Sequence, residues 1–258
     1  MKRTGIMDNT NDTKNTKIDK ILKNYRCLSG SALKTIALVT MLIDHTASVL
    51  LANMKFAVTP LFTAAGTEIT WYMIFRTIGR IAFPIYCFLL VEGYMHTRDR
   101  KKYGMRLLIF AIISEIPWSL EHTGTLFSTT HNVFFTLFSG LCAIYVYDNF
   151  RSDRMKTAVL LIFIFVISMY AKCDYGIKGT GFILFLYLMR ENSLIRALVG
   201  CCFFARPDTV IPAFAFIQLY NGKRGYIKGR VLQYLFYILY PAHMLLLYVL
   251  KLVWFGYK

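Results

Sequence analysis

The fold is decided by an apolar stretch that occupies residues 33–52 and reads LKTIALVTMLIDHTASVLLA. At 20 residues it has about the length of helix that crosses the hydrocarbon core of a bilayer. Its charged or titratable side chains are Lys34 near the start and the neighbours Asp44 and His45 further in. We therefore predict a membrane-spanning helix that carries two ionisable side chains within the bilayer.

The composition of the whole chain agrees with a membrane protein. Hydrophobic residues make up 56% of its 258 residues and the mean hydropathy is +0.47, which exceeds the apolar share of ordinary globular domains. Eight further apolar segments follow the first, at about residues 70–94, 105–120, 132–148, 157–171, 176–189, 194–205, 208–220 and 231–251. The predicted fold class is an all-α, polytopic membrane helix bundle with about nine transmembrane segments, located in a cell membrane. Several segments are shorter than the ~20 residues of a full crossing, which favours a compact bundle with a polar interior.

The first 30 residues differ from the rest of the chain. They are rich in Asn, Thr, Asp and Lys and contain few apolar side chains. Such a composition does not bury enough surface to fold, so residues 1–30 are predicted to be a flexible, basic cytoplasmic tail and residues 31–258 the transmembrane domain. The tail has neither an apolar core nor a small-residue cleavage site, so no removable signal peptide is expected.

The positive charges predict the orientation in the membrane. The formal net charge is +16, and Lys and Arg gather in the tail, in the loop after the second segment and in the loop after the fourth. The intervening loops carry fewer of them, as loops on the outer side of a membrane do. We predict a cytoplasmic N-terminus and an outer C-terminus, and we do not expect nucleic-acid binding, because these charges occupy short polar breaks between apolar runs.

The ionisable side chains within the apolar segments need a partner or a purpose, since each costs ~2.5–3.5 kcal/mol on insertion scales. Lys34 lies eleven residues before His45, which places both on one helix face to within ~20° and separates them by ~16 Å. Arg76 and Arg80 lie one turn apart in the second segment and repel each other unless an anion meets them. Asp44 is the candidate partner by type and depth.

Two interpretations apply to each of these groups. The pairing of Asp44 with an arginine is either a salt bridge that only fixes helix register or part of a reactive site. For His45 the functional interpretation is favoured, because it follows an aspartate inside a membrane helix. Glu115 in the third segment and His243 in the last remain open between pairing and function.

Other residues favour structural interpretations. His131 is expected at the start of a helix, and His96 and His122 in interfacial loops. The six cysteines show no CxxC or metal-ligand spacing, so they are interpreted as small hydrophobic residues and no metal site is predicted. The chain has no glycine-rich phosphate loop, HExxH or GxSxG motif, which leaves acid–base chemistry by histidine with a carboxylate.

Seven motifs carry a resemblance to a known family: Leu33–His45, Arg76–Pro84, Glu92–Tyr94 followed by His96–Arg98, Ser114–Pro117, Asn132–Leu137, Asn221–Gly225 and Tyr240–His243. On these motifs, over about residues 31–251, the chain resembles the TraX family. That family is named for the conjugation protein that N-acetylates the amino-terminal residue of the F-type pilin subunit, and it is related to larger integral-membrane acyltransferases.

The resemblance implies an acyltransferase that moves an acetyl group from acetyl-CoA to an amine or hydroxyl of a pilin-like or cell-surface acceptor. The larger enzymes carry a basic residue, ten intervening positions and a histidine in their first membrane helix, which Lys34 and His45 reproduce. Their paired arginines are separated by two residues, whereas Arg76 and Arg80 are separated by three.

The implied roles divide into a donor side and a catalytic side. The phosphates of CoA are expected to meet the cations Lys34, Arg76, Arg80 and Arg98. His45 is expected to act as general base or acyl carrier, polarised by Asp44 or another carboxylate, with Glu115 and His243 as further catalytic candidates.

Two other classes of function stay open at this stage. One is a non-catalytic membrane factor for the assembly of pili or surface proteins. The other is a transporter that uses Asp44 and His45 as a proton relay, which the absence of an inverted repeat disfavours.

Overall fold

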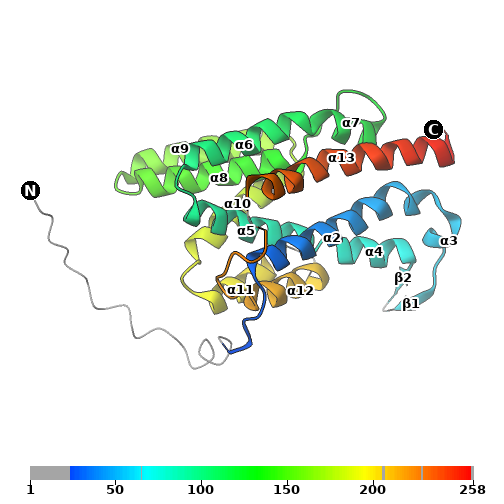
Figure 1. Cartoon of the computed structure of the whole chain (residues 1–258), viewed down its shortest axis with the longest axis horizontal. Helices are drawn as coiled ribbons and strands as arrows, with labels where there is room; N and C mark the ends of the chain where they lie inside the picture. The colour runs from blue at the N-terminus through cyan, green and yellow to red at the C-terminus, as the bar shows by residue number, and fades with distance from the viewer. Residues whose placement is uncertain (1–23, 65, 205–206, 228, 257–258) are drawn as a thin grey trace, which may run out of the picture.

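The computed structural model describes residues 24–64, 66–204, 207–227 and 229–256, and these are mainly helical (Figure 1). In chain order the elements are α2 (Gly30–Val49), η1 (Leu51–Asn53), α3 (Lys55–Val58), β1 (Phe62–Ala64), β2 (Thr67–Ile69), α4 (Trp71–Gly79), α5 (Ala82–His96), α6 (Arg100–Ile113), α7 (Glu115–Thr123), α8 (Val133–Phe150), α9 (Arg154–Tyr170), α10 (Gly176–Leu188), α11 (Ser193–Cys202), α12 (Pro207–Gln218) and α13 (Arg230–Phe255).

In the part of the chain that the structure describes, each of the nine predicted apolar segments is mainly helical, and two of them are broken near a proline. The second segment consists of α4 and α5, which meet at Arg80, four residues before Pro84. The third consists of α6 and α7, and α6 ends at Ile113, four residues before Pro117. A proline has no N–H and its ring clashes with the carbonyl four residues earlier, so the continuous helix ends there. The first break sets Arg80 at the junction of two helices.

Within the described residues, five helical stretches are long and apolar enough to cross a membrane: Gly30–Asn53, Trp71–His96, Arg100–Thr123, Val133–Phe150 and Val231–Phe255. The other four apolar segments, α9 to α12, are helices of 17, 13, 10 and 12 residues. The chain is therefore a multi-pass membrane protein with a helical bundle, as predicted, and its helices are of unequal length.

The helices pack around α8 and α2. α8 contacts α5, α6, α9 and α10, while α2 contacts α4, α5 and α13, and α13 also packs on α7. Figure 1 shows α2 and α13 running in the same direction. The candidate active site lies beside the interface of α2 and α13, next to α4 and α7.

The positively charged turns lie together at one end of the molecule. The α5–α6, α8–α9 and α10–α11 turns, which contain Arg98, Arg151 and Arg190, are at the left of Figure 1. The hairpin, the α7–α8 loop and the end of α13 are at the right. This separation agrees with the predicted alternation of loops across the membrane.

One feature of the outer loops was not predicted. Strands β1 and β2 pair antiparallel, with Phe62 opposite Ile69, and Gly66 at φ +78° lies between them. This small hairpin and α3 connect α2 to α4 at the end of the bundle opposite the charged turns. The predicted tail falls largely on residues 1–23, which lie outside the described residues.

The start of α2 is closed by the chain segment that precedes α13. The N–H groups of Gly30 and Ser31 donate to the carbonyls of Lys223 and Arg224, both at 2.8 Å. The Ser31 hydroxyl also donates to the Arg224 carbonyl at 2.7 Å and accepts from the Ile227 N–H at 2.8 Å. The first turn of a helix has N–H groups without intrahelical partners, and this segment satisfies them.

Candidate active site

A polar cavity of about 80 Å³ lies where α2, α4, α7 and the α9–α10 loop meet. Its lining residues are Asp44, His45, Ser48, Arg76, Arg80, Trp118, His122, Asp174 and Tyr175. The cavity thus collects two carboxylates, two guanidiniums and two imidazoles from four separate parts of the chain.

Asp44 and Arg76 form an ion pair across the α2–α4 interface. Arg76 Nη1 donates to Asp44 Oδ2 at 2.7 Å and to the Asp44 carbonyl at 3.3 Å. Both side chains are largely covered, at 21% and 16% exposed, so the pair is protected from solvent screening. The expected partnership of Asp44 with one of the two arginines is confirmed, and the partner is Arg76.

Gly79 allows α4 to approach α2 closely enough for this pair. A Cβ atom added at Gly79 would lie 2.2 Å from the Asp44 Cβ and 2.5 Å from its Cα. Because real Cβ atoms do not come this close to a neighbouring backbone, glycine is required here. Small residues serve the same purpose between other membrane helices.

Arg80 differs from Arg76 because its guanidinium has no hydrogen bond or ion pair with another described residue. It lines the polar cavity and also a second cavity of about 50 Å³. The other residues around that second cavity are Phe83, Pro84, Tyr175, Phe204, Thr209 and Val210. Arg80 is therefore a cation placed between a polar and a mainly apolar space, available to an anionic or carbonyl group of a ligand.

His45 is connected to α13 through His243. The His45 Nδ1 and His243 Nε2 atoms are 2.5 Å apart, and His243 Nδ1 lies 2.7 Å from the Leu239 carbonyl oxygen. The two rings are parallel to within 1° with centroids 4.8 Å apart, so the two nitrogens point at each other near the plane of both rings. Tyr240 packs edge-on against both rings and restricts their rotation.

This chain of contacts fixes the tautomer of both neutral histidines. A carbonyl oxygen only accepts, so His243 Nδ1 carries the proton and donates to Leu239. His243 Nε2 is then an acceptor, and His45 Nδ1 donates to it. The proton of neutral His45 is accordingly on Nδ1, so Nε2 is unprotonated and carries a lone pair. A histidine held in this way is suited to act as a base.

The structure does not bring all expected site residues into the cavity. Glu115 binds His131 Nδ1 at 2.6 Å and Asn132 Nδ2 at 2.8 Å, so it ties the start of α7 to the start of α8. His131 lies just before α8, as predicted, and Asn132 caps that helix. Glu115 lies about one helical turn before Trp118 of the cavity.

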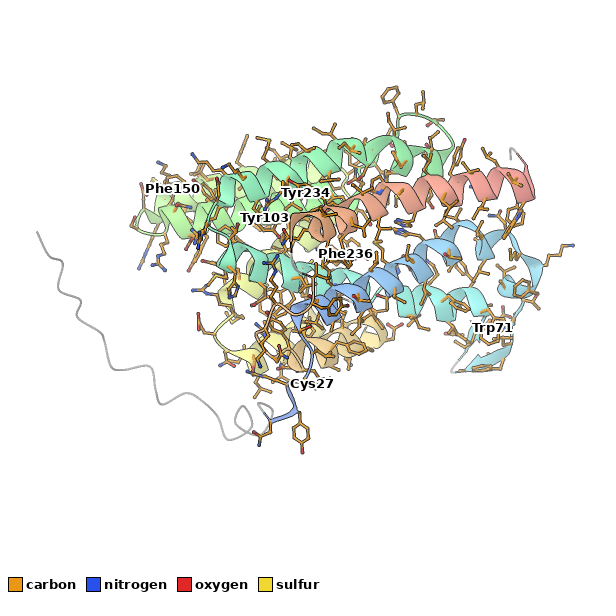
Figure 2. The ribbon with its side chains drawn as sticks, viewed as in Figure 1. Cys27, Trp71, Tyr103, Phe150, Tyr234 and Phe236 are labelled. Carbon is orange, nitrogen blue, oxygen red and sulfur yellow. The ribbon has the colours of Figure 1, made fainter. Side chains whose placement is uncertain are left out.

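Two expected donor-side cations lie outside the cavity as well. The Lys34 Nζ atom is 4.5 Å from the ring centroid of Phe236 and 5.7 Å from that of Tyr237. Figure 2 shows Phe236 close to the start of α2. Arg98 is exposed in the α5–α6 turn. The cavity therefore holds Arg76 and Arg80, while Lys34 and Arg98 lie toward the end where the charged turns gather.

Sequence reasoning missed two titratable residues of the cavity. His122 was expected in a loop but lies in the last turn of α7, where its ring stacks on Trp118 at 3.5 Å and its Nδ1 atom contacts the Glu121 side chain. The i, i+4 spacing of Trp118 and His122 was the available signal. His96 was also expected in a loop but is the last residue of α5, where its side chain is exposed.

Asp174 was also missed, because it lies in a loop that the sequence marks only as polar. Its N–H donates to the His131 carbonyl at 2.9 Å, and its own carbonyl accepts from the Thr136 hydroxyl. Tyr175 follows in the left-handed region at φ 63°, with its ring stacked on Phe83 at 3.5 Å. Burial raises the pKa of the Asp174 carboxyl above its ordinary value, while the charges of His122 and Arg80 oppose the shift.

Comparisons with known proteins find relatives of this chain. Two relatives are the probable fimbrial assembly protein FimC, serogroup H1, of Dichelobacter nodosus and the uncharacterized protein RP591 of Rickettsia prowazekii (strain Madrid E). The first is 30% identical over 249 residues, which cover 85% of this chain and 94% of the relative. The second is 27% identical over 203 residues, which cover 76% of this chain and 67% of the relative.

No solved structure matches the chain. The family model described as TraX protein matches residues 29–251, a range that contains every residue of the polar cavity. The chain belongs to the TraX family.

Proposed function

We propose that the protein is an integral-membrane acyltransferase that moves an acetyl group from acetyl-CoA to an amine of a pilin-like or other surface protein. The observation that carries the proposal is the chain Leu239–His243–His45, which leaves an unprotonated nitrogen of His45 at a polar cavity. Membership of the TraX family and the name of the fimbrial relative support the acceptor class.

In the proposed reaction His45 Nε2 takes a proton from the acceptor nitrogen as that nitrogen attacks the thioester carbonyl. The Arg80 guanidinium, which has no partner among the described residues, donates to the oxygen that becomes negative in the tetrahedral intermediate. The C–S bond then breaks, and the CoA thiolate takes the proton back from His45. His243 accepts from His45 Nδ1 throughout and stabilises the imidazolium.

The donor side uses positive charge at two depths. Arg80 lies at the cavity, and Lys34 lies on the same helix as His45, nearer the charged turns. The main-chain carbonyls of Lys223 and Arg224 accept hydrogen bonds from the first N–H groups of α2. Lys223 and Arg224 therefore lie near Lys34, which is in the first turns of the same helix. We propose that the CoA phosphates meet these outer cations and Arg98 while the thioester reaches the cavity.

The test is release of free CoA thiol by the purified protein in the presence of acetyl-CoA and a peptide with a free N-terminus. We expect His45→Ala to lower turnover by about 10²–10⁴-fold, the usual contribution of a general base. We expect His243→Ala to lower it by about 10–100-fold, as for other residues that orient a reactive imidazole. His96→Ala is the matched control, because His96 is exposed at the end of α5, and its turnover should equal that of the wild type. Unchanged turnover in His45→Ala would remove His45 from the mechanism.

A second candidate is a non-catalytic membrane factor for the assembly of pili, which the name of the fimbrial relative favours. In that case the polar cavity only holds helices together. A wild-type protein that transfers no acetyl group to any acceptor tested, yet co-purifies with a pilin-like protein, would support it over the acyltransferase.

A further inference from the structure

Some of the charged side chains that line the polar cavity form an ion pair with each other and others do not. Asp44 and Arg76 neutralise each other in an ion pair at 2.7 Å. Arg80 and the carboxylate of Asp174 line the same cavity, and neither forms an ion pair with another described residue; the Tyr175 N–H donates to the Asp174 carboxylate. One cation and one anion without an ion-pair partner thus remain beside His45, and a ligand with complementary groups would pair with both.

The position of Asp174 is built by the surrounding backbone. Its N–H and its carbonyl are both engaged, with His131 and Thr136, and Tyr175 is anchored on Phe83. Gly179 is enclosed by the side chains of Thr136, Tyr175 and Phe83, where a Cβ atom would lie within 3.0 Å of each. The carboxylate is therefore held on rigid elements, as a substrate-binding group needs to be.

We propose that Asp174 binds the ammonium form of the acceptor and accepts its first proton. This inference rests on the proposed acetyl transfer and adds a residue to it. Asp44 is excluded from this role because Arg76 occupies its Oδ2, and its Oδ1 is buried against Gly79.

The chemistry of an amine acceptor requires two proton acceptors. At neutral pH the amine arrives as R–NH₃⁺ and must lose one proton to gain a lone pair, which Asp174 accepts. The amine loses a second proton when the N–C bond forms. His45 accepts this proton and passes it to the CoA thiolate as the C–S bond breaks. The products are the amide, free CoA thiol and one proton released from Asp174. A hydroxyl acceptor loses only one proton, so the second base favours an amine.

The burial of Asp174 supports the same role. A carboxylate in a confined site is disfavoured in its charged form, which raises its pKa. An ammonium group that enters the cavity offsets this cost by pairing with it. The Asp174 carboxylate is thus a group that a cationic ligand would stabilise.

The test is binding, measured by titration calorimetry in detergent, of a short peptide amide with a free N-terminus and of the same peptide with an acetylated N-terminus. We expect the wild type to bind the free peptide at least tenfold more tightly and Asp174→Asn to bind both alike. Asp153→Asn is the matched control: Asp153 caps α9 through the Lys156 N–H, and asparagine caps a helix equally well. It should keep the wild-type preference.

Equal binding of both peptides by the wild type, or a preference that persists in Asp174→Asn, would overturn the proposal. If Asp174→Asn does not fold, Asp174→Glu is the variant to measure. Its carboxylate is displaced, so this variant should still prefer the free peptide over the acetylated one but bind the free peptide at least threefold more weakly than the wild type. Wild-type affinity of Asp174→Glu for the free peptide would contradict the proposal. Binding does not depend on transfer. A selective site without release of CoA thiol would contradict the acyltransferase and leave Asp174 as an ammonium-binding residue.

Discussion

At the scale of single residues, the carbonyl of Leu239 determines which nitrogen of His45 is basic. It lies four residues before His243, one helical turn earlier on α13. Through His243 it orients a ring on another helix. In the proposed mechanism His243 and one main-chain oxygen take the place that a carboxylate has in many catalytic triads.

Gly79 is the residue whose size the site depends on most. We expect Gly79→Ala to lower the free energy of unfolding by at least about 1–3 kcal/mol. The new methyl group overlaps the Asp44 backbone and pushes α4 away from α2. Thermal unfolding in detergent measures this. Gly181→Ala is the control: it is also within a helix, and its Cβ would be 3.6 Å from the nearest atom, so it should be neutral or stabilising. Equal melting of the two variants would contradict the close approach of α2 and α4.

At the scale of elements, the helices were predictable and the cavity was predictable only in part. Apolar runs and prolines are local signals, and they locate α2 and the break before Pro84. Asp44, His45 and Arg76 were found because charge within a membrane helix stands out against its neighbours. Asp174 lies in a polar loop and His122 offers only its spacing from Trp118, so their place in the site becomes clear from the cavity that they share with residues of α2 and α4.

The closure of α2 by residues 219–227 gives a prediction for two glycines in the same segment. Gly222 and Gly225 have φ of +75° and +87°, so alanine is strained by ~1–2 kcal/mol at either position. At Gly225 the Cβ would also lie 2.3 Å from the Ser29 hydroxyl, whereas at Gly222 no atom lies within 4 Å. Gly225→Ala should therefore lower the melting temperature more than Gly222→Ala, as measured in detergent. A larger effect at Gly222 would be inconsistent with this contact.

At the scale of the whole molecule, the charged turns and the hairpin mark opposite sides of the membrane. We expect a single cysteine at Arg98 or Ser152, in an otherwise cysteine-free chain, to react with a membrane-impermeant maleimide only after the cells are permeabilised. A cysteine at Thr67 or Thr129 should react in intact cells, because these positions lie at the other end of the bundle. The reverse pattern would show that the orientation is wrong.

The contact between His45 and His243 joins helices that are 198 positions apart in the chain. During synthesis α2 is inserted long before α13 leaves the ribosome, so His45 first resides in the membrane without the partner that sets its tautomer. The proposed reaction centre is consequently completed only when the segment carrying α13 has been inserted and packed. Until then a nascent chain can hold its cations and the Asp44–Arg76 pair in place and still have no oriented base, which couples the onset of activity to the end of membrane insertion.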